Sequence, residues 1–257
     1  MNRLLSSFER QDQIIQFLQR SQRISIEEIC RRFTISEATA RRDLEALGTE
    51  GKVRRVHGGA IALAQTPPEA PILQRQNEQP DEKQRIGEAA AEIVQDGETV
   101  FLGSGTTVLA VARALRARQN LTVITNSLPV VNVFAGADGI TVICLGGMLR
   151  PSELSFIGHI TEQSLAEVHA DKVFIGVRGV SLDFGLTNEY LPETMTDRAI
   201  LHAGRELIVV VDHTKFERTA TVLLSPLDQV QTIVTDGPLP AELSATLKER
   251  QIRIIEA

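Results

Sequence analysis

The sequence has little cysteine and no long apolar run. Its two cysteines, Cys30 and Cys144, lie in apolar patterns, and neither has a second Cys or a His at the spacing of metal ligands. We therefore expect two reduced core thiols, no metal site and no cofactor. No apolar stretch approaches the ~18 residues of a membrane span, and the N-terminus becomes charged before an apolar run reaches signal-peptide length. These absences predict a soluble, cytoplasmic protein with no membrane partner.

An overall excess of basic residues is also missing, because the formal net charge is −6. The charge is nevertheless uneven along the chain. Residues 1–60 contain ten Arg and one Lys against eight acidic residues, a net charge of +3, so the remainder carries −9. This asymmetry indicates that only the N-terminal segment meets a polyanion.

A break in the sequence pattern occurs at residues 61–80. Three prolines within five residues, Pro67, Pro68 and Pro71, precede a Gln-rich segment that ends at Pro80. This stretch has neither helical nor strand periodicity, which is typical of an extended linker. We therefore predict a small domain over 1–60, a linker over 61–80 and a larger domain over 81–257.

The larger domain alternates short apolar runs with helical segments. Strands are predicted over 99–102, 121–125, 140–145, 172–176, 207–211, 230–235 and 252–255. Segments such as 108–115 have helical spacing between them. Strands that alternate with helices are typical of an α/β domain with a mostly parallel sheet.

The first 60 residues predict two short helices after an initial one. Ile14 and Leu18 give the first helix an apolar face, and Ser25 and Glu28 have the spacing of a capping box at the start of the second. The third helix begins after Ser36 as its N-cap. Its apolar face is formed by Ala40, Leu44 and Leu47.

Basic and hydroxyl side chains occupy the other face of this third helix. Thr39, Arg41 and Arg42 lie near its start, where a helix in the major groove contacts base edges and phosphates. The next residues, 52–60, read as a strand, a turn and a strand, which we interpret as a small β wing. Arg54, Arg55 and His57 would lie near the DNA backbone. Spacing alone also allows a helical hairpin whose arginines are solvated, and a surface role for His57.

Two motifs in this segment resemble the signature of the DeoR family of bacterial regulators. The sequence S-E-A-T-A-R-R-D-L at 36–44 is similar to the family's S-x-x-T-I-R-R-D-L, and R-R-V-H-G-G-A at 54–60 is similar to its R-x-H-G-G-A. Ala40 replaces the usual isoleucine. The resemblance implies a winged helix-turn-helix, mainly α with a small β wing, and operator contacts by Thr39, Arg41 and Arg42.

A glycine-rich loop follows the first predicted strand of the larger domain. Two glycines permit a tight turn, hydroxyls supply donors, and the next helix begins with unpaired amides, so this loop suits a phosphate. The loop residues are Gly103, Ser104, Gly105, Thr106 and Thr107. The loop has neither the Gly-Lys-Ser/Thr of a Walker A motif nor a complete G-x-G-x-x-G, and a plain strand-to-helix turn is the alternative.

More polar corners follow later predicted strands. Because such corners converge in open α/β sheets, they predict a shared ligand crevice. They comprise Thr125, Asn126, Ser127, Gly146, Gly147 and Lys215. Lys215 would supply a cation to a phosphate, with an exposed loop lysine as the alternative.

These corners also resemble the DeoR family's sensor domain. The resemblance implies a fold similar to ribose-phosphate isomerases and CoA transferases, and an effector that is a phosphorylated sugar or polyol. The family usually has Asp at the position of Gly103, and often Lys at that of Arg198, which keeps a charge for phosphate. The change at Gly103 leaves the identity of the effector open.

An enzyme is the alternative reading of the larger domain. A sugar-phosphate isomerase would need an acidic cluster like D-G-A-D-E, whereas Asp236-Gly237 has no such continuation. A CoA transferase would need a nucleophilic Glu, but Glu189 is followed by Tyr190. We therefore predict a repressor rather than an enzyme, which binds double-stranded operator DNA as a homodimer or homotetramer. An architectural DNA-binding protein without an effector is a third reading.

Overall fold

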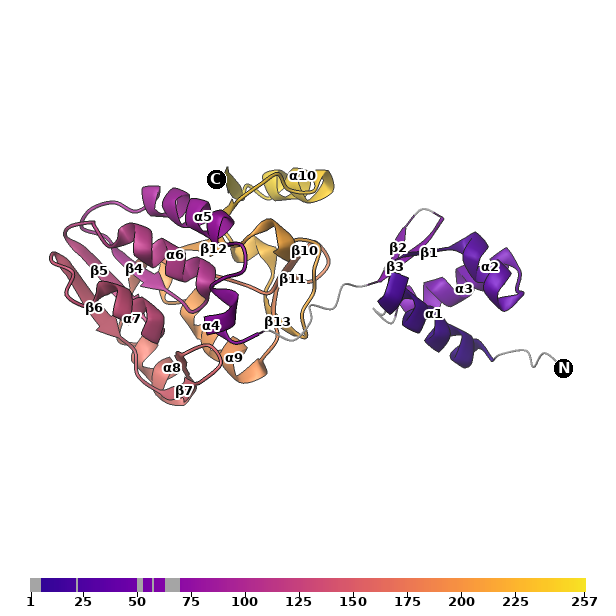
Figure 1. Cartoon of the computed structure of the whole chain (residues 1–257), viewed down its shortest axis with the longest axis horizontal. Helices are drawn as coiled ribbons and strands as arrows, with labels where there is room; N and C mark the ends of the chain where they lie inside the picture. Colours follow the sequence, from indigo (N-terminus) through magenta and orange to yellow (C-terminus); the bar gives the residue numbers. More distant parts are fainter. Residues whose placement is uncertain (1–5, 22, 50–52, 57, 63–69) are drawn as a thin grey trace. The chain divides into compact units, whose positions relative to one another are not determined.

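The computed structural model describes residues 6–21, 23–49, 53–56, 58–62 and 70–257. They form two compact units, Met1–Gln65 and Thr66–Ala257, which we call the head and the sensor (Figure 1). Among the described residues, no helix combines the length and apolar character that a membrane span requires.

The described residues of the head form three helices and a small antiparallel sheet. Helices α1 (Ser7–Ser21), α2 (Ile26–Phe33) and α3 (Glu37–Thr49) pack with strands β1 (Arg23–Ser25), β2 (Val53–Val56) and β3 (Gly59–Ala62), in the sheet order β1-β3-β2. The predicted capping box of Ser25 and Glu28 is present. The amide of Thr39 donates to Ser36 Oγ at 3.3 Å, so Ser36 caps α3 as predicted. The core contains the predicted apolar faces of Ile14 and Leu18 and of Ala40, Leu44 and Leu47, and it also contains Ile29 of α2.

A seven-stranded sheet forms the centre of the sensor. Its order is β15-β14-β12-β9-β4-β5-β6, and every neighbouring pair is parallel. The strands are β4 (Thr99–Leu102), β5 (Leu121–Thr125), β6 (Ile140–Cys144), β9 (Ala170–Ile175), β12 (Gly204–Val210), β14 (Thr232–Thr235) and β15 (Arg253–Glu256). All seven predicted strands are present in this sheet, which confirms the α/β class.

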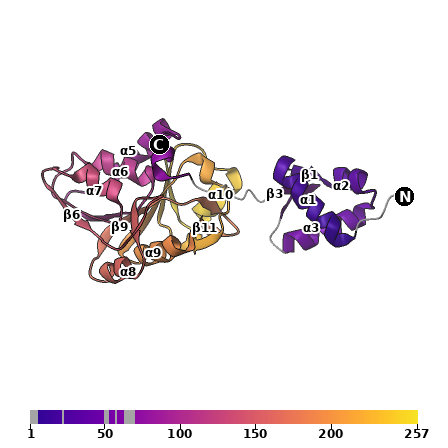
Figure 2. The ribbon, with the colours of Figure 1, turned by 60° about the horizontal axis from the view of Figure 1, so that its bottom comes forward.

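Helices cover both faces of this sheet (Figure 2). On one face lie α5 (Pro80–Glu92), α6 (Thr106–Leu115) and α7 (Leu128–Phe134); on the other lie α8 (His159–Leu165), α9 (Leu191–Leu201) and α10 (Ala241–Glu249). Successive residues of β4 alternate between the two cores: Val100 and Leu102 join one, and Phe101 joins the other. Burial on both faces explains why the strands read as nearly continuous apolar runs.

Shorter elements complete the sensor at the carboxyl ends of the strands. A hairpin is formed by β7 (Met148–Arg150) and β8 (Ser155–Ile157). A three-stranded antiparallel sheet is formed by β10 (Gly179–Ser181), β11 (Gly185–Asn188) and β13 (Val222–Ser225). Two 3₁₀ turns occupy His213–Lys215 and Leu227–Gln229.

Two expectations about the chain's organisation are wrong in part. Residues 70–80 do not continue the extended linker, because they contain the helical turn α4 (Ile72–Arg75). Ile72 is buried in the sensor, and its amide donates to Ser152 O at 2.8 Å. Cys30 is half-buried against the head core, but Cys144 is exposed because β6 is an edge strand.

Candidate functional site

The start of α3 presents the predicted DNA-reading side chains. Arg41 and Arg42 are exposed, as is Ser36, and Thr39 is partly exposed. Arg41 is only loosely paired with Glu37, at 3.5 Å on the same helix, and both side chains are more than half exposed. These arginines are therefore available to a ligand at little energetic cost.

A buried ion pair fixes α3 against α1. Arg10 Nε lies 2.5 Å from Asp43 Oδ2, and the two side chains are only 10% and 5% exposed. Arg10 Nη2 and Gln11 Nε2 donate to the other carboxylate oxygen at 3.0 and 3.2 Å. Because Asp43 follows Arg42 directly, this pair sets the orientation of the helix turn that bears the exposed arginines.

The wing approaches the same surface of the head. A shallow cavity of about 200 Å³ brings Arg41 of α3 together with Arg55 of β2 and Gly58 of the wing turn. The side chain of Arg54 and the whole of His57 lie outside the described residues. Arg41 of the helix and Arg55 of the wing are therefore on one surface, as a winged helix-turn-helix requires.

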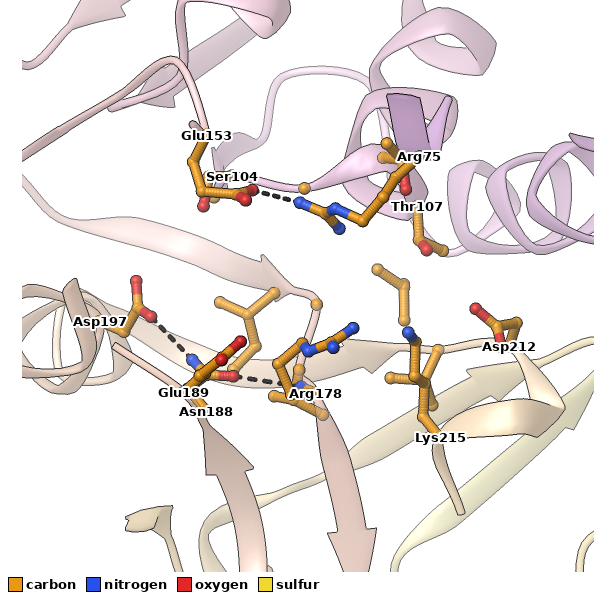
Figure 3. A pocket seen from close by; sticks show the side chains of 18 of the residues that line it. Arg75, Ser104, Thr107, Glu153, Arg178, Asn188, Glu189, Asp197, Asp212 and Lys215 are labelled. Carbon is orange, nitrogen blue, oxygen red and sulfur yellow. Dashed lines mark hydrogen bonds and ion pairs between the residues drawn. The ribbon is translucent and has the colours of Figure 1, made fainter. Parts of the chain in front are cut away.

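The sensor contains a cavity of about 250 Å³ at the carboxyl ends of β4, β9 and β12 (Figure 3). Between β4 and β9 the order of the sheet reverses: from β4 the chain proceeds to β5 and β6, and from β9 to β12 and β14. In open parallel sheets, a ligand crevice forms at such a switch point because the loops on its two sides diverge.

The predicted glycine-rich loop forms one wall of this cavity. Gly103, Ser104, Gly105, Thr106 and Thr107 all line it. Gly105 is the residue before α6 and has φ 110°, a conformation that only glycine adopts easily. The first amides of a helix have no partners within the helix, so the start of α6 offers donors and a partial positive charge to an anion.

Basic side chains from four different segments face this helix start. Lys215 lines the cavity as predicted, with Arg75, Lys83, Arg178 and Arg218. In Figure 3, Arg75, Arg178 and Lys215 point into the same space. Burial lowers the pKa of Lys83, although the nearby charge of Asp212 opposes this shift. An anion in the cavity would favour the protonated form of Lys83.

The opposite end of the cavity carries amide and carboxyl groups. Asn188 Nδ2 donates to Asp197 Oδ2 at 2.9 Å, and Glu189 and Glu193 lie on the same wall. Burial and the neighbouring charge of Glu193 raise the pKa of Asp197 well above its usual range. Glu193 itself is paired with Arg150 and accepts from Ser155 Oγ at 3.0 Å. These donors and acceptors suit hydroxyl groups.

Several predicted effector residues are not brought to the cavity. Thr125 Oγ1 donates to Leu102 O at 2.6 Å, Asn126 Nδ2 donates to Phe156 O at 2.9 Å, and the Ser127 amide donates to Thr125 Oγ1. These hydrogen bonds attach the end of β5 to its neighbours. The three residues lie away from the cavity because β5 lies on the far side of β4 from the switch point, where β8 covers it.

Two more sets of predicted effector residues lie away from this cavity. The corner of Gly146 and Gly147 packs on α8, where Thr161 Oγ1 donates to Gly146 O at 2.8 Å. Arg198 is exposed and its guanidinium donates to Leu223 O of β13 instead of facing the cavity. On the same helix, Asp197 is the residue that lines the cavity.

Sequence reasoning missed more than half of the cavity wall. The missed residues with charged or amide side chains include Arg75, Lys83, Glu153, Arg178, Asn188 and Asp197. Arg75, Glu153 and Asn188 come from the presumed linker, from the hairpin and from the small antiparallel sheet, whereas Lys83 and Asp197 lie on the helices α5 and α9. The segments of the first three residues are too short to show a period.

Comparison with known proteins covers both units. The description "DeoR-like helix-turn-helix domain" matches residues 10–66, and "DeoR C terminal sensor domain" matches residues 78–237. The glycerol-3-phosphate regulon repressor of Escherichia coli (strain K12) is 34% identical over 96% of this chain and 97% of its own length. The HTH-type transcriptional repressor GlcR of Bacillus subtilis (strain 168) is 33% identical over 94% and 93%, respectively.

Solved structures resemble the chain more distantly. Ribose 5-phosphate isomerase A from Methanocaldococcus jannaschii is 20% identical, with a TM-score of 0.40 over 53% of this chain and 54% of that chain. The eIF2B beta subunit from Chaetomium thermophilum is 15% identical, with a TM-score of 0.45 over 84% and 58%.

Both units have thus been matched in chain order, and full-length relatives share about a third of the sequence. The exposed arginines of α3 and the cavity at the switch point lie within the two matched segments. The chain belongs to the DeoR family of transcriptional regulators.

Proposed function

We propose that this chain is a repressor of genes for carbohydrate use that a phosphorylated sugar or polyol releases from its operator. The observation that carries the effector class is the two-ended cavity. One end combines the start of α6 with Lys215 and Arg178, and the other presents Asn188 and the carboxyl of Asp197. A phosphate suits the first end and hydroxyls suit the second.

The relatives support the direction of control. Several of them are named as repressors, and these names include a glycerol-3-phosphate regulon and an aga operon. Because those names describe repressors, we propose that the cavity senses its ligand and does not turn it over. A protein whose target is bacterial DNA acts in the cytoplasm.

We further propose that the chain acts as a homodimer or homotetramer. One head reads one half-site, and two heads related by symmetry read a palindrome with half-sites about 34–36 Å apart, or a multiple of that distance. Thr39, Arg41 and Arg42 would contact base edges or phosphates, and Ser36, Arg54, Arg55 and His57 would contact the backbone.

The test is fluorescence anisotropy on DNA from directly upstream of the chain's own gene. The panel consists of sn-glycerol 3-phosphate, glucose 6-phosphate and myo-inositol 1-phosphate, each beside its unphosphorylated parent. We expect nanomolar binding that one phosphate ester, but not its parent, weakens by roughly 5–150-fold. Binding that no ester alters would leave the DNA assignment and contradict this effector class. Absence of binding at low salt would overturn the repressor proposal.

A further inference from the structure

The segment that joins the two matched domains is part of the cavity. Residues 67–77 lie between the helix-turn-helix match and the sensor match. We call residues 70–83 the strap; it contains α4 and the first turn of α5. Ala70, Arg75, Glu78, Gln79 and Lys83 of the strap all line the cavity. The strap therefore forms a wall of the effector site and also continues from the end of the head unit at Gln65.

Arg75 attaches the strap to the rest of the sensor. Its Nε donates to Ala70 O at 2.8 Å, and its Nη2 pairs with the carboxylate of Glu153. The side chains of Arg75 and Glu153 are only 10% and 5% exposed. A buried ion pair of this kind has lost its hydration, so it is held by the partner's charge and is sensitive to a competing anion. Phosphate matches the fork of a guanidinium at least as well as a carboxylate does.

Lys83 holds the strap from the opposite side. Its Nζ donates to Arg75 O at 2.9 Å and also to Glu78 O. It is buried, and the charges of Asp212 and Lys215 reach it across the cavity. A phosphate near Lys83 would accept the third ammonium hydrogen, and its negative charge would draw the ammonium away from the two strap carbonyls.

The joint between α4 and α5 is conformationally strained. Gln79 has φ 49° and ψ 54°, a left-handed conformation that is uncommon for a residue with a side chain, and Pro80 follows at the first position of α5. Such strain persists only where surrounding contacts hold it, and the contacts here include those of Arg75 and Lys83 beside that of Ile72 with Ser152. Loss of these contacts would let the strap change direction at Gln79.

We propose that the strap transmits effector occupancy to the head: the phosphate draws Arg75 away from Glu153 and Lys83 away from the strap carbonyls, which repositions the chain at Ala70. This inference rests on the proposed function. The strap has two arrangements, one held by Glu153 and one held by the phosphate, and the effector acts because it binds the second more tightly. Ala70 lies five residues after the last residue of the head, so its position limits where the head can reach.

Hydrogen–deuterium exchange on the full-length wild type tests the proposal directly. The probe is inorganic phosphate, with chloride at matched ionic strength as the reference. We expect phosphate to protect peptides over 103–109 and to change exchange by at least about threefold over 70–79, while peptides over 241–249 stay unchanged. Protection at 103–109 with no change at 70–79 would overturn the strap proposal alone. No change in either segment would overturn the proposed function and the strap proposal with it.

A substitution then tests transmission to the head without any effector. In Glu153→Gln the carboxylate charge that holds Arg75 is removed while the guanidinium stays in the cavity. We expect the folded variant to bind its upstream DNA at least about fivefold more weakly than wild type, because its strap already resembles the effector-bound arrangement. Glu167→Gln, which removes an exposed carboxylate, should keep wild-type affinity.

The variant has a clear contrary outcome. If circular dichroism shows that Glu153→Gln is folded and its DNA affinity equals that of wild type, the ion pair does not hold the strap in the DNA-binding arrangement, and the proposal fails. If the variant does not fold, the exchange result on the wild type decides.

Discussion

Asp43 links the stability of the head to the geometry of the surface that bears the exposed arginines of α3. Its carboxylate accepts from Arg10 and Gln11 while the preceding residue is one of the exposed arginines. In Asp43→Asn a buried guanidinium loses its counter-charge, so we expect the free energy of unfolding of the head to fall by about 3–5 kcal/mol. Hydrogen exchange of α3 amides in the full-length protein measures this change. Glu45→Gln, at an exposed site on the same helix, should change it by less than about 0.5 kcal/mol.

Asp197 makes stability depend on pH. Its pKa is raised in the folded protein by burial and by Glu193, so the folded state binds its proton more tightly than the unfolded state, whose pKa stays near 3.8. The proton therefore contributes stability that is complete below this value and is lost as the pH rises through the folded pKa.

Asp197→Asn is expected to remove this dependence. The stability of the variant relative to wild type should increase as the pH rises above about 4, and urea unfolding at a series of pH values measures the difference. Asn keeps an acceptor for Asn188. Asp183→Asn changes an exposed site, so its stability should depend on pH in the same way as that of wild type. A constant difference between Asp197→Asn and wild type would contradict the raised pKa.

The start of α6 depends on the backbone of one glycine. A Cβ on Gly105 would meet no atom within 4 Å, so the cost of Gly105→Ala comes from its φ of 110°. We expect a loss of about 1–3 kcal/mol in stability and weaker protection of 103–109 by phosphate. Gly176→Ala is a matched control on the same cavity wall, because its Cβ would lie 3.8 Å or more from its neighbours and its φ is ordinary. Equal effects of the two substitutions would show that bulk, and not backbone geometry, matters.

Helix α3 and the wing should contribute to DNA binding in different ways. If Arg41 or Arg42 reads guanine bidentately, its replacement by Ala should cost about 1–3 kcal/mol and relax preference at one base pair. Arg55→Ala in β2 should instead weaken binding to all DNA sequences by a similar factor. It should also reduce the slope of log K against log salt by about one. Anisotropy titrations on the operator and on point-substituted operators separate these roles. If Arg41→Ala and Arg42→Ala weaken binding to all these DNA sequences by the same factor, neither arginine reads a base.

The elements that sequence could predict are those with a repeating signal. The seven strands of the large sheet are apolar runs, and the central strands are buried on both faces. Helix α3 has an apolar face and a cap, so these elements are recognisable from short stretches of sequence. Strands β7, β8 and β10 have three residues each, and no period is visible over so short a run. The sequence predicts the pocket at 103–107 and at Lys215, whereas the rest of its wall comes from the strap, from short elements, from α9 and from the ends of β9 and β12.

The sequence does not show which loops at the strand ends border the cavity, because a short segment does not reveal the order of the strands in the sheet. The polar residues after β5 have the same character as those after β4, yet only the β4 loop borders the switch point. The sequence places both at strand ends but does not say which strand stands beside β9. The departure at Gly103 has a local reason in this structure: a Cβ there would lie 3.3 Å from Phe174 O, closer than most such contacts.

At the scale of the whole molecule, the two units have separate hydrophobic cores, so they should unfold separately. We expect calorimetry of the full-length protein to show two transitions. Inorganic phosphate at about 100 times its Kd should stabilise only the sensor, by about 2.7 kcal/mol. Asp43→Asn should lower the unfolding temperature of the head transition only. A single transition that both perturbations move would contradict independent cores.

The division of the chain also decides how hybrid regulators should be assembled. A head from one relative can be joined to the sensor of another to pair a new operator with a new inducer. The sequence match to the sensor begins at residue 78, but a fusion there would discard Ile72 and Arg75, which are buried in the sensor. The crossover therefore belongs at Gln65–Thr66, so that the hybrid protein receives the sensor together with the strap that belongs to it.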